Sequence, residues 1–346
     1  MLVKAAKDIA RQWVIDEASK VPGFHGAYYA GSATWLADNA VLPATSDIDI
    51  MVVLDDPNPK DKLGKFIYQN VLLEVTYLPR EQVESPELVL GHYHLAGSFR
   101  RPNVILDPSG QLTELQRMVA KGFAKCAWVY RRCEQARDTV VARLQGLDTS
   151  APFHEQVTSW LFAAGGLPHV LLVAGLQNPT VRRRYVAARE LLESYGRLDF
   201  YENLLELLGC AQMSRARVEA QLPALIEVFD AAKTVIKTPF FFAADISNMA
   251  RPVAIEGSRE LIECGYHREA IFWMVATYSR CQMVLYHDAP VVLRERFHQG
   301  YNQLLGELGI TSTADLDQRS EQIQAFLPRL WDVTEAILTA NPEIED

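Results

Sequence analysis

The stretch that decides the fold of this chain is DIDIMVVL at residues 47–54. Two isoleucines alternate there with Asp47 and Asp49, the run ends in apolar residues, and a turn-forming segment follows at 55–59. Because side chains at i and i+2 lie on one face of a strand, the two aspartates share a face and the isoleucines occupy the opposite one. The pattern predicts a strand with an apolar core face and two carboxylates at its beginning.

Further strand and helix patterns surround this strand in the N-terminal third of the chain. Residues 24–30 (FHGAYYA) are typical of a strand, and two apolar runs separated by Asn70 are typical of a strand pair. A short apolar run before Asp107-Pro108-Ser109-Gly110 ends at a predicted turn. We predict strands at 24–30, 47–54, 65–69, 71–78 and 104–106, and helices at 3–20, about 31–38, and 80–95.

The pattern changes after residue 111, where apolar residues recur at helical spacing and strand patterns nearly disappear. Predicted helices cover about 111–146, 153–175, 179–194, 198–208, 214–235, 257–264, 267–287, 290–308 and 318–340. The expected fold class is therefore α+β. An N-terminal α/β domain with a mixed sheet would cover residues 1–110, and a large all-α domain would cover 111–346, with any further boundary near 238–256.

Composition narrows the class of protein. Hydrophobic residues make up 49% of the 346 residues and charged residues 22%, as in ordinary globular proteins. The net charge of -9 disfavours a nucleic-acid substrate and is compatible with a cationic small molecule. Five cysteines without a CxxC pair indicate reduced thiols and no zinc site. The apolar stretch 160–176 is interrupted by glycine and proline, so we expect buried helices, no membrane span and a cytoplasmic protein.

Two features of residues 31–49 suit phosphate and metal chemistry. Gly31 lets the backbone approach a ligand closely, and Ser32 opens a predicted helix whose N–H groups could bind phosphate. Asp47 and Asp49 repel each other on their shared strand face unless a cation lies between them. Carboxylate oxygens are hard ligands of the kind that Mg²⁺ prefers.

A third carboxylate, Glu74, stands in the middle of LLEVTYL, where glutamate is unusual. If this strand lies beside residues 47–54, Glu74 joins the two aspartates as a third metal ligand or as a general base. The alternative is a solvent-facing glutamate on an edge strand.

A second Asp-x-Asp, at Asp315 and Asp317, shows how little this motif proves alone. It follows Ser312 and Thr313 at a predicted helix start, where acidic residues are favoured by the helix dipole. We interpret this copy as a helix cap.

Taken together, Gly31-Ser32, Asp47-x-Asp49 and Glu74 resemble the nucleotidyltransferase superfamily that includes DNA polymerase β and the aminoglycoside and lincosamide nucleotidyltransferases. The resemblance covers about residues 24–110, and the helical remainder is similar in layout to the C-terminal domains of the antibiotic-modifying members. The spacer between Ser32 and Asp47 is slightly long for the family, and the step from Asp49 to Glu74 is short.

The resemblance implies an enzyme that uses two Mg²⁺ ions and an NTP, with ATP expected as the co-substrate. Asp47, Asp49 and Glu74 would hold the metal, and an NMP group would pass to a hydroxyl of a small molecule such as an aminoglycoside-like antibiotic, with release of pyrophosphate. The alternatives are a protein- or RNA-modifying nucleotidyltransferase of a toxin–antitoxin type and a non-catalytic nucleotide-binding protein. The oligomeric state is left open.

Cations in the helical region are candidate contacts for the triphosphate. Asn178 and Pro179 predict a helix start, and Arg183 lies among three arginines that oppose the dipole there, which favours a nearby anion. Lys237 is a second candidate. The alternative for each is a solvated basic side chain.

Two histidine patterns have a weaker claim to function. Arg280 and His287 have a spacing that resembles the motif of HEPN-type RNases, although this pattern is common by chance. His92 and His94 could bind a metal, but no further ligand clusters near them in the sequence.

Overall fold

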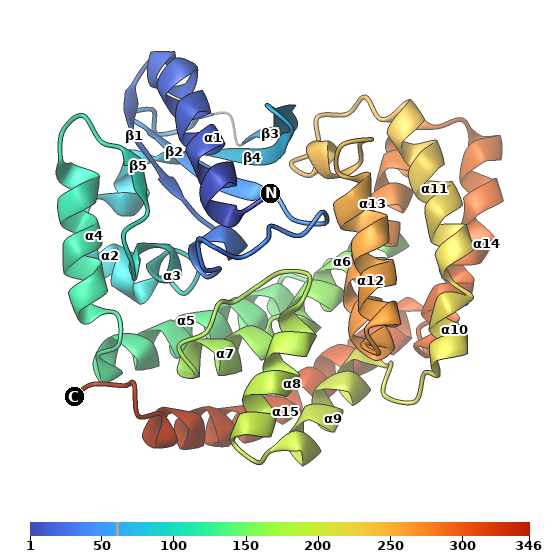
Figure 1. Ribbon diagram of the computed structural model, residues 1–346. Coiled ribbons are helices and arrows are strands. Elements are labelled where there is room, and N and C mark those ends of the chain that lie inside the picture. Colours follow the sequence, from blue (N-terminus) through green and yellow to red (C-terminus); the bar gives the residue numbers. More distant parts are fainter. Residues whose placement is uncertain (60–61) are drawn as a thin grey trace. The chain divides into compact units, whose positions relative to one another are not determined.

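The computed structural model describes residues 1–59 and 62–346, which form two compact units (Figure 1). The first, here called the sheet unit, comprises Met1–Gln135, Leu176–Asn178 and Pro342–Asp346. The second, the helical unit, comprises Ala136–Gly175 and Pro179–Asn341. The predicted α+β class is confirmed at this level, because a five-stranded mixed sheet precedes a mostly helical region.

The sheet unit is built on five strands in the order β3-β4-β2-β1-β5. β2 pairs in parallel with β4 and antiparallel with β1, while the outer strands β3 and β5 are both antiparallel to their neighbours. The strands are β1 (Phe24–Tyr29), β2 (Ile48–Leu54), β3 (Lys62–Tyr68), β4 (Val71–Pro79) and β5 (Val104–Leu106). All five predicted strands are therefore present.

One face of the sheet is covered by helix α1 (Val3–Asp16), which lies across the strands in Figure 1. The buried face of α1 packs against the inward side chains of β2 and β4, including Ile48, Ile50 and Val75. A short 3₁₀ turn, Ala18–Lys20, follows α1, so the helix predicted at 3–20 is confirmed with a tighter last turn.

The opposite face of the sheet packs against short helices and α4. Tyr28 and Val53 from the strands share an apolar cluster with residues of α2 (Pro86–Gly91), α3 (Ala96–Phe99) and α4 (Gln111–Gly122). Asp49 and Glu74 point to this same face of the sheet, because they alternate with core residues of the α1 face.

Four predicted helices are interrupted in the structure, those at 80–95, 111–146, 153–175 and 214–235. Residues 80–95 contain a 3₁₀ turn at Arg80–Val83 and then α2, because Ser85 caps a new helix whose first residue is Pro86. The single helix predicted over 111–146 divides into α4 and α5 (Cys126–Gln145). The compact units divide within α5 and not at residue 110, since α4 packs on the sheet.

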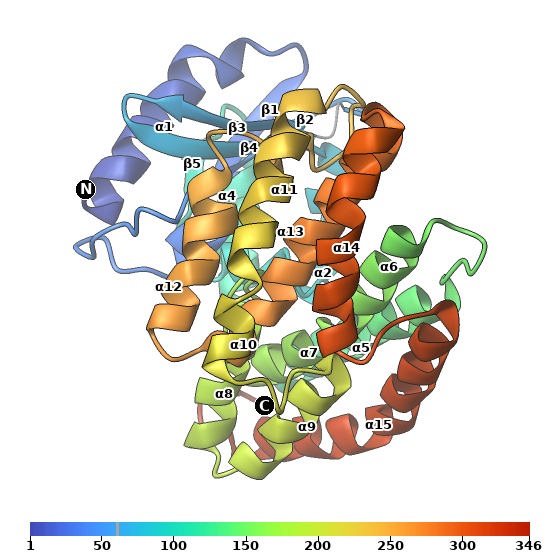
Figure 2. The same ribbon diagram turned by 90° about the vertical axis from the view of Figure 1, so that its right-hand side faces the viewer.

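The helical unit is organised around α13, which is buried along most of its length. Figure 2 shows α11, α13 and α14 side by side, in agreement with their contacts. Both sides of the 238–256 interruption belong to this unit. Its helices, besides the second half of α5, are α6 (Phe153–Ala164), α7 (Leu167–Ala174), α8 (Arg184–Ser194), α9 (Leu198–Leu208), α10 (Arg215–Glu219), α11 (Leu222–Val235), α12 (Gly257–Glu263), α13 (His267–Asp288), α14 (Val291–Glu307) and α15 (Thr313–Ala340).

The segment Phe153–Ala174 is long and apolar enough to cross a membrane by length and composition, and 78% of its most apolar window is buried inside the structure. It consists of two helices, α6 and α7, separated at Gly165-Gly166. The prediction of buried helices in this stretch is therefore confirmed.

The buried imidazole of His154 makes the stability of the helical unit depend on pH. His154 is 9% exposed, and among the described residues its Nε2 has no hydrogen-bond partner. Burial, reinforced by the nearby His287 and His298, lowers its pKa from 6.5 to about 4. The unfolded chain therefore binds a proton between these pH values that the folded chain does not, so protonation favours unfolding.

We expect the free energy of unfolding to fall as the pH drops from about 6.5 to about 4, by at most about 3 kcal/mol from this residue. Urea denaturation across this range should show a flatter pH dependence in His154→Phe than in the unmodified protein. The matched control is a Phe substitution at exposed His94. Equal slopes in the His154→Phe variant and the unmodified protein would contradict the assignment.

Candidate functional site

The pairing of β2 with β4 brings the three predicted carboxylates together. Asp49 on β2 is the register partner of Glu74 on the parallel strand β4, so both side chains lie on the same face of adjacent strands. Asp47 precedes β2 by one residue and lies on the same side. Carboxylate oxygens of all three lie within 4.8 Å of one another, and all three residues are half-buried. The edge-strand alternative for Glu74 is wrong, since β4 lies between β3 and β2.

A lysine that the sequence patterns did not single out completes this cluster. Lys65 on β3 is the register partner of Glu74, and its Nζ forms ion pairs with Asp47 Oδ2 and Glu74 Oε2. The side chain of Lys65 is only 5% exposed. We call Asp47, Asp49, Glu74 and Lys65 the carboxylate–lysine cluster.

The position of Lys65 could have been found by counting residues across the predicted hairpin. Gln69 and Asn70 both have positive φ angles, 46° and 65°, as in a two-residue hairpin turn. Such a turn places Tyr68 opposite Val71 and therefore Lys65 opposite Glu74. A lysine at this place pairs with a carboxylate across the strands.

Gly31 lies directly against the carboxylate of Asp49. Its φ of 59° and ψ of -154° form a conformation that side-chain-bearing residues rarely adopt. A Cβ atom at this position would lie 1.8 Å from Asp49 Oδ2. The residue before Gly31, Ala30, donates its N–H to the backbone carbonyl of Asp49 at 3.0 Å. Glycine is therefore required here so that the chain can pass the carboxylate.

The helix predicted after Gly31 is much shorter than expected. Only a 3₁₀ turn, Ser32–Thr34, forms, and the Thr34 hydroxyl donates to the carbonyl of Gly31 at 2.9 Å. Because this helical turn ends by Leu36, it carries no sizeable helix dipole. Of the expected phosphate contacts, the backbone and the hydroxyl of half-buried Ser32 remain as candidates.

The predicted helix start at Asn178 and Pro179 is wrong, because α8 begins at Arg184. Arg184 is buried and donates to the carbonyls of Val181 and Gly165 at 2.7 and 2.8 Å, so this arginine satisfies backbone groups of its own unit. Among the neighbouring arginines, Arg182 likewise donates to a backbone carbonyl, whereas Arg183 is exposed.

Lys237 and Arg183 are the candidate phosphate contacts in the helical unit, and both side chains are exposed there. The backbone N–H of Lys237 donates to the carboxylate of Asp288 at 2.7 Å, which fixes the chain after α11. Neither residue belongs to the compact unit that carries the carboxylate–lysine cluster.

The remaining sequence candidates have structural partners. Arg280 pairs with Asp245 at 3.1 Å and lines a pocket of about 630 Å³ in the helical unit, while His287 packs against aromatic rings. The Nδ1 of His92 accepts from the N–H groups of His94 and Leu95 at 3.3 and 3.4 Å. These contacts explain both patterns without a metal or a substrate.

The second Asp-x-Asp is a helix cap, as predicted. Asp315 and Ser312 form a reciprocal capping box at the start of α15. Hydrogen bonds from Thr311 and Ser312 lower the pKa of Asp315, and Asp317 is exposed.

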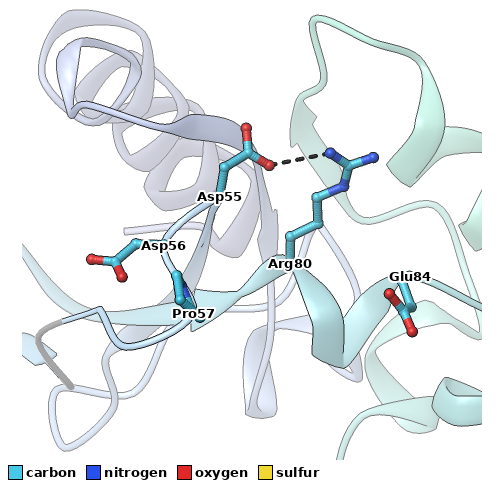
Figure 3. A pocket seen from close by; sticks show the side chains of 5 residues that line it. All are labelled: Asp55, Asp56, Pro57, Arg80 and Glu84. Atoms are coloured by element: carbon cyan, nitrogen blue, oxygen red, sulfur yellow. Dashed lines mark hydrogen bonds and ion pairs between the residues drawn. The ribbon is translucent and has the colours of Figure 1, made fainter.

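A separate pocket of about 420 Å³ lies at the other end of β2 from the carboxylate–lysine cluster. Figure 3 shows the Asp55 carboxylate and the Arg80 guanidinium directed toward each other across it, at 3.3 Å. Arg80 also donates to Gln111 at 2.9 Å. Because Arg80 already contacts Asp55 and Gln111, this pocket is a weaker candidate for the functional site than the cluster.

The close approach of Gly31 to Asp49 gives a direct test of the site. Gly31→Ala should lower the free energy of unfolding by about 1–3 kcal/mol from backbone strain and should also displace the Asp49 carboxylate. We therefore expect weaker Mn²⁺ binding, measured by isothermal titration calorimetry.

The matched control is Gly110→Ala, because Gly110 also has a positive φ, 76°, yet among the described residues no neighbouring atom lies within 4 Å of the place that a Cβ would take. This control should lose about 1 kcal/mol of stability from its left-handed backbone and bind Mn²⁺ normally. Equal Mn²⁺ affinity in the two variants would contradict the role given to Gly31.

Comparisons with known proteins do not assign this chain to a family. No protein-family model matches the sequence, and no curated protein is significantly similar to it. The chemistry of the carboxylate–lysine cluster is therefore the basis for assigning a function to this chain.

Proposed function

We propose that this protein is a Mg²⁺-dependent nucleotidyltransferase that moves an NMP group from an NTP, with ATP as the first candidate, to a hydroxyl of a small molecule. The single observation that carries the proposal is the convergence of Asp47, Asp49 and Glu74 on one face of adjacent strands, with oxygens within 4.8 Å of one another. The resemblance in sequence pattern supports the same reaction class.

The donor set of the cluster fits Mg²⁺. All three candidate ligands are carboxylates, and hard oxygen ligands are those that Mg²⁺ and Mn²⁺ take. Histidine and cysteine, which favour zinc, are absent from this group among the described residues. The buried ammonium of Lys65 shows that positive charge is stabilised at this place.

When bound, Mg²⁺ would neutralise charge on the NTP phosphates and lower the pKa of the acceptor hydroxyl. The residues of the chain would hold the metal and the substrates in position. Asp47 and Asp49 are fixed by the start of β2, and Glu74 is fixed by its register with Asp49. Glu74, which is paired with Lys65, is the carboxylate that we propose as proton acceptor for the hydroxyl, and Gly31 brings backbone close to Asp49.

Positioning of this kind is the main requirement of phosphoryl-type transfer, because the reaction depends on alignment and electrostatic stabilisation more than on covalent help from the protein. The sheet that carries Asp49, Glu74 and Lys65, with Asp47 directly before β2, suits this requirement.

The acceptor that we propose is a cationic small molecule, such as an aminoglycoside-like antibiotic. The net charge of -9 favours an approaching cation over a polyanion and disfavours nucleic acid as the substrate. We further propose a cytoplasmic location, where NTP and Mg²⁺ are both present.

The reaction is tested by Mg²⁺-dependent release of pyrophosphate from each NTP in the presence of aminoglycosides and lincosamides. Asp49→Asn should lower acceptor-dependent release by on the order of 100-fold or more, because the site loses a ligand charge and its geometry. Asp317→Asn provides the matched control, since it changes the exposed aspartate of the second Asp-x-Asp.

Acceptor-dependent release that is lost only in Asp49→Asn would establish the reaction class. Binding of Mg²⁺-NTP without release for any small acceptor would overturn the small-molecule assignment and favour a protein or RNA acceptor. No binding of NTP would favour a protein without this catalytic activity.

A further inference from the structure

The carboxylate–lysine cluster contains a cation of its own, supplied by β3. Lys65 reaches from β3 past its register partner Glu74 and forms ion pairs with both Glu74 and Asp47. Asp47 and Glu74 belong to different segments of the chain, so the ammonium group bridges carboxylates that no backbone pairing joins directly.

Moving the Lys65 ammonium group out of this position would cost free energy. Its side chain is 5% exposed, and the side chains of its partners are 15% and 14% exposed. A buried ammonium group needs a charged or hydrogen-bonded partner, and a buried pair that loses one partner leaves a charge without compensation. Separating the ammonium group from its carboxylates therefore carries a free-energy cost.

The charges of the cluster then determine how much further positive charge it can take. Three carboxylates and one ammonium give the cluster a net charge of -2. One divalent cation neutralises this charge, whereas a second would have to approach a site that is already neutral and lies beside a fixed ammonium group.

We infer that the site takes a single divalent cation, held by Asp47 and Asp49, and that the Lys65 ammonium occupies the place of a second cation between Asp47 and Glu74. This inference rests on the proposed metal site and amends the expectation of two Mg²⁺ ions. Lys65 acts as a positioning residue, because it sets the charge and the place of the carboxylates that bind the metal.

The number of bound ions can be counted directly with Mn²⁺ alone. Electron paramagnetic resonance of free Mn²⁺ during titration gives the stoichiometry and the dissociation constant without any catalytic reaction. We expect one Mn²⁺ per chain in the unmodified protein. Lys65→Met should bind two Mn²⁺ ions, and the first should bind on the order of 10-fold more tightly because a nearby positive charge is gone.

Two further variants separate charge from packing. Lys65→Arg keeps the positive charge and should bind one ion. Lys65→Gln removes the charge but keeps a hydrogen-bond donor, and should behave like Lys65→Met if the latter does not fold. Lys121→Met, which changes an exposed lysine of α4, serves as the matched control and should bind one ion with unchanged affinity.

Two Mn²⁺ ions in the unmodified protein would overturn the inference, as would one ion of unchanged affinity in folded Lys65→Met and Lys65→Gln. Neither outcome would affect the proposed metal site, since Asp49→Asn would still weaken binding. If the unmodified protein bound no Mn²⁺, or if Asp49→Asn bound it equally well, the proposed function itself would fail.

Discussion

Three carboxylates lie within 4.8 Å of one another in a half-buried place, and their mutual repulsion must be offset by positive charge. The fold provides one such charge in Lys65, delivered by the neighbouring strand. The order of the strands places this positive charge beside the carboxylates. β4 lies between β2 and β3, so that its single glutamate faces an aspartate on one side and a lysine on the other.

This row of charges depends on the apolar packing behind it. Ile48, Ile50 and Val75 alternate with the charged residues and are fully buried against the helix α1. A shift of one residue in the register of β2 would exchange the two faces and bury the aspartates in the apolar cluster, which is strongly disfavoured. The same alternation that stabilises the sheet therefore places the carboxylates.

The helical unit uses much of its polar chemistry for its own packing. Arg184 binds backbone carbonyls at the start of α8, and Arg280 pairs with Asp245 among aromatic rings. Within this unit, some arginines thus bind internal partners, whereas others, such as Arg183, are exposed. Burial alone distinguishes these two uses, because adjacent arginines look alike in a sequence.

The sequence by itself determined the α+β class, the strands and the two-residue spacing that puts Asp47 and Asp49 on one face, because alternation in a strand is a local property. It also placed Asp315 at a helix start, because the capping pattern involves residues only three apart. The sequence did not determine which strand lies beside β2, and hence whether Glu74 joined the aspartates. Nor did it reveal that the helix after Gly31 would end after one turn, or that Arg184 would be buried.

Only the tertiary structure decided these points, because they depend on contacts between segments far apart in the chain. The tertiary structure also placed Lys65 opposite Glu74 and against Asp47. The buried position of Lys65 is explained by the charges around it, and those charges come from the start of β2 and from β4.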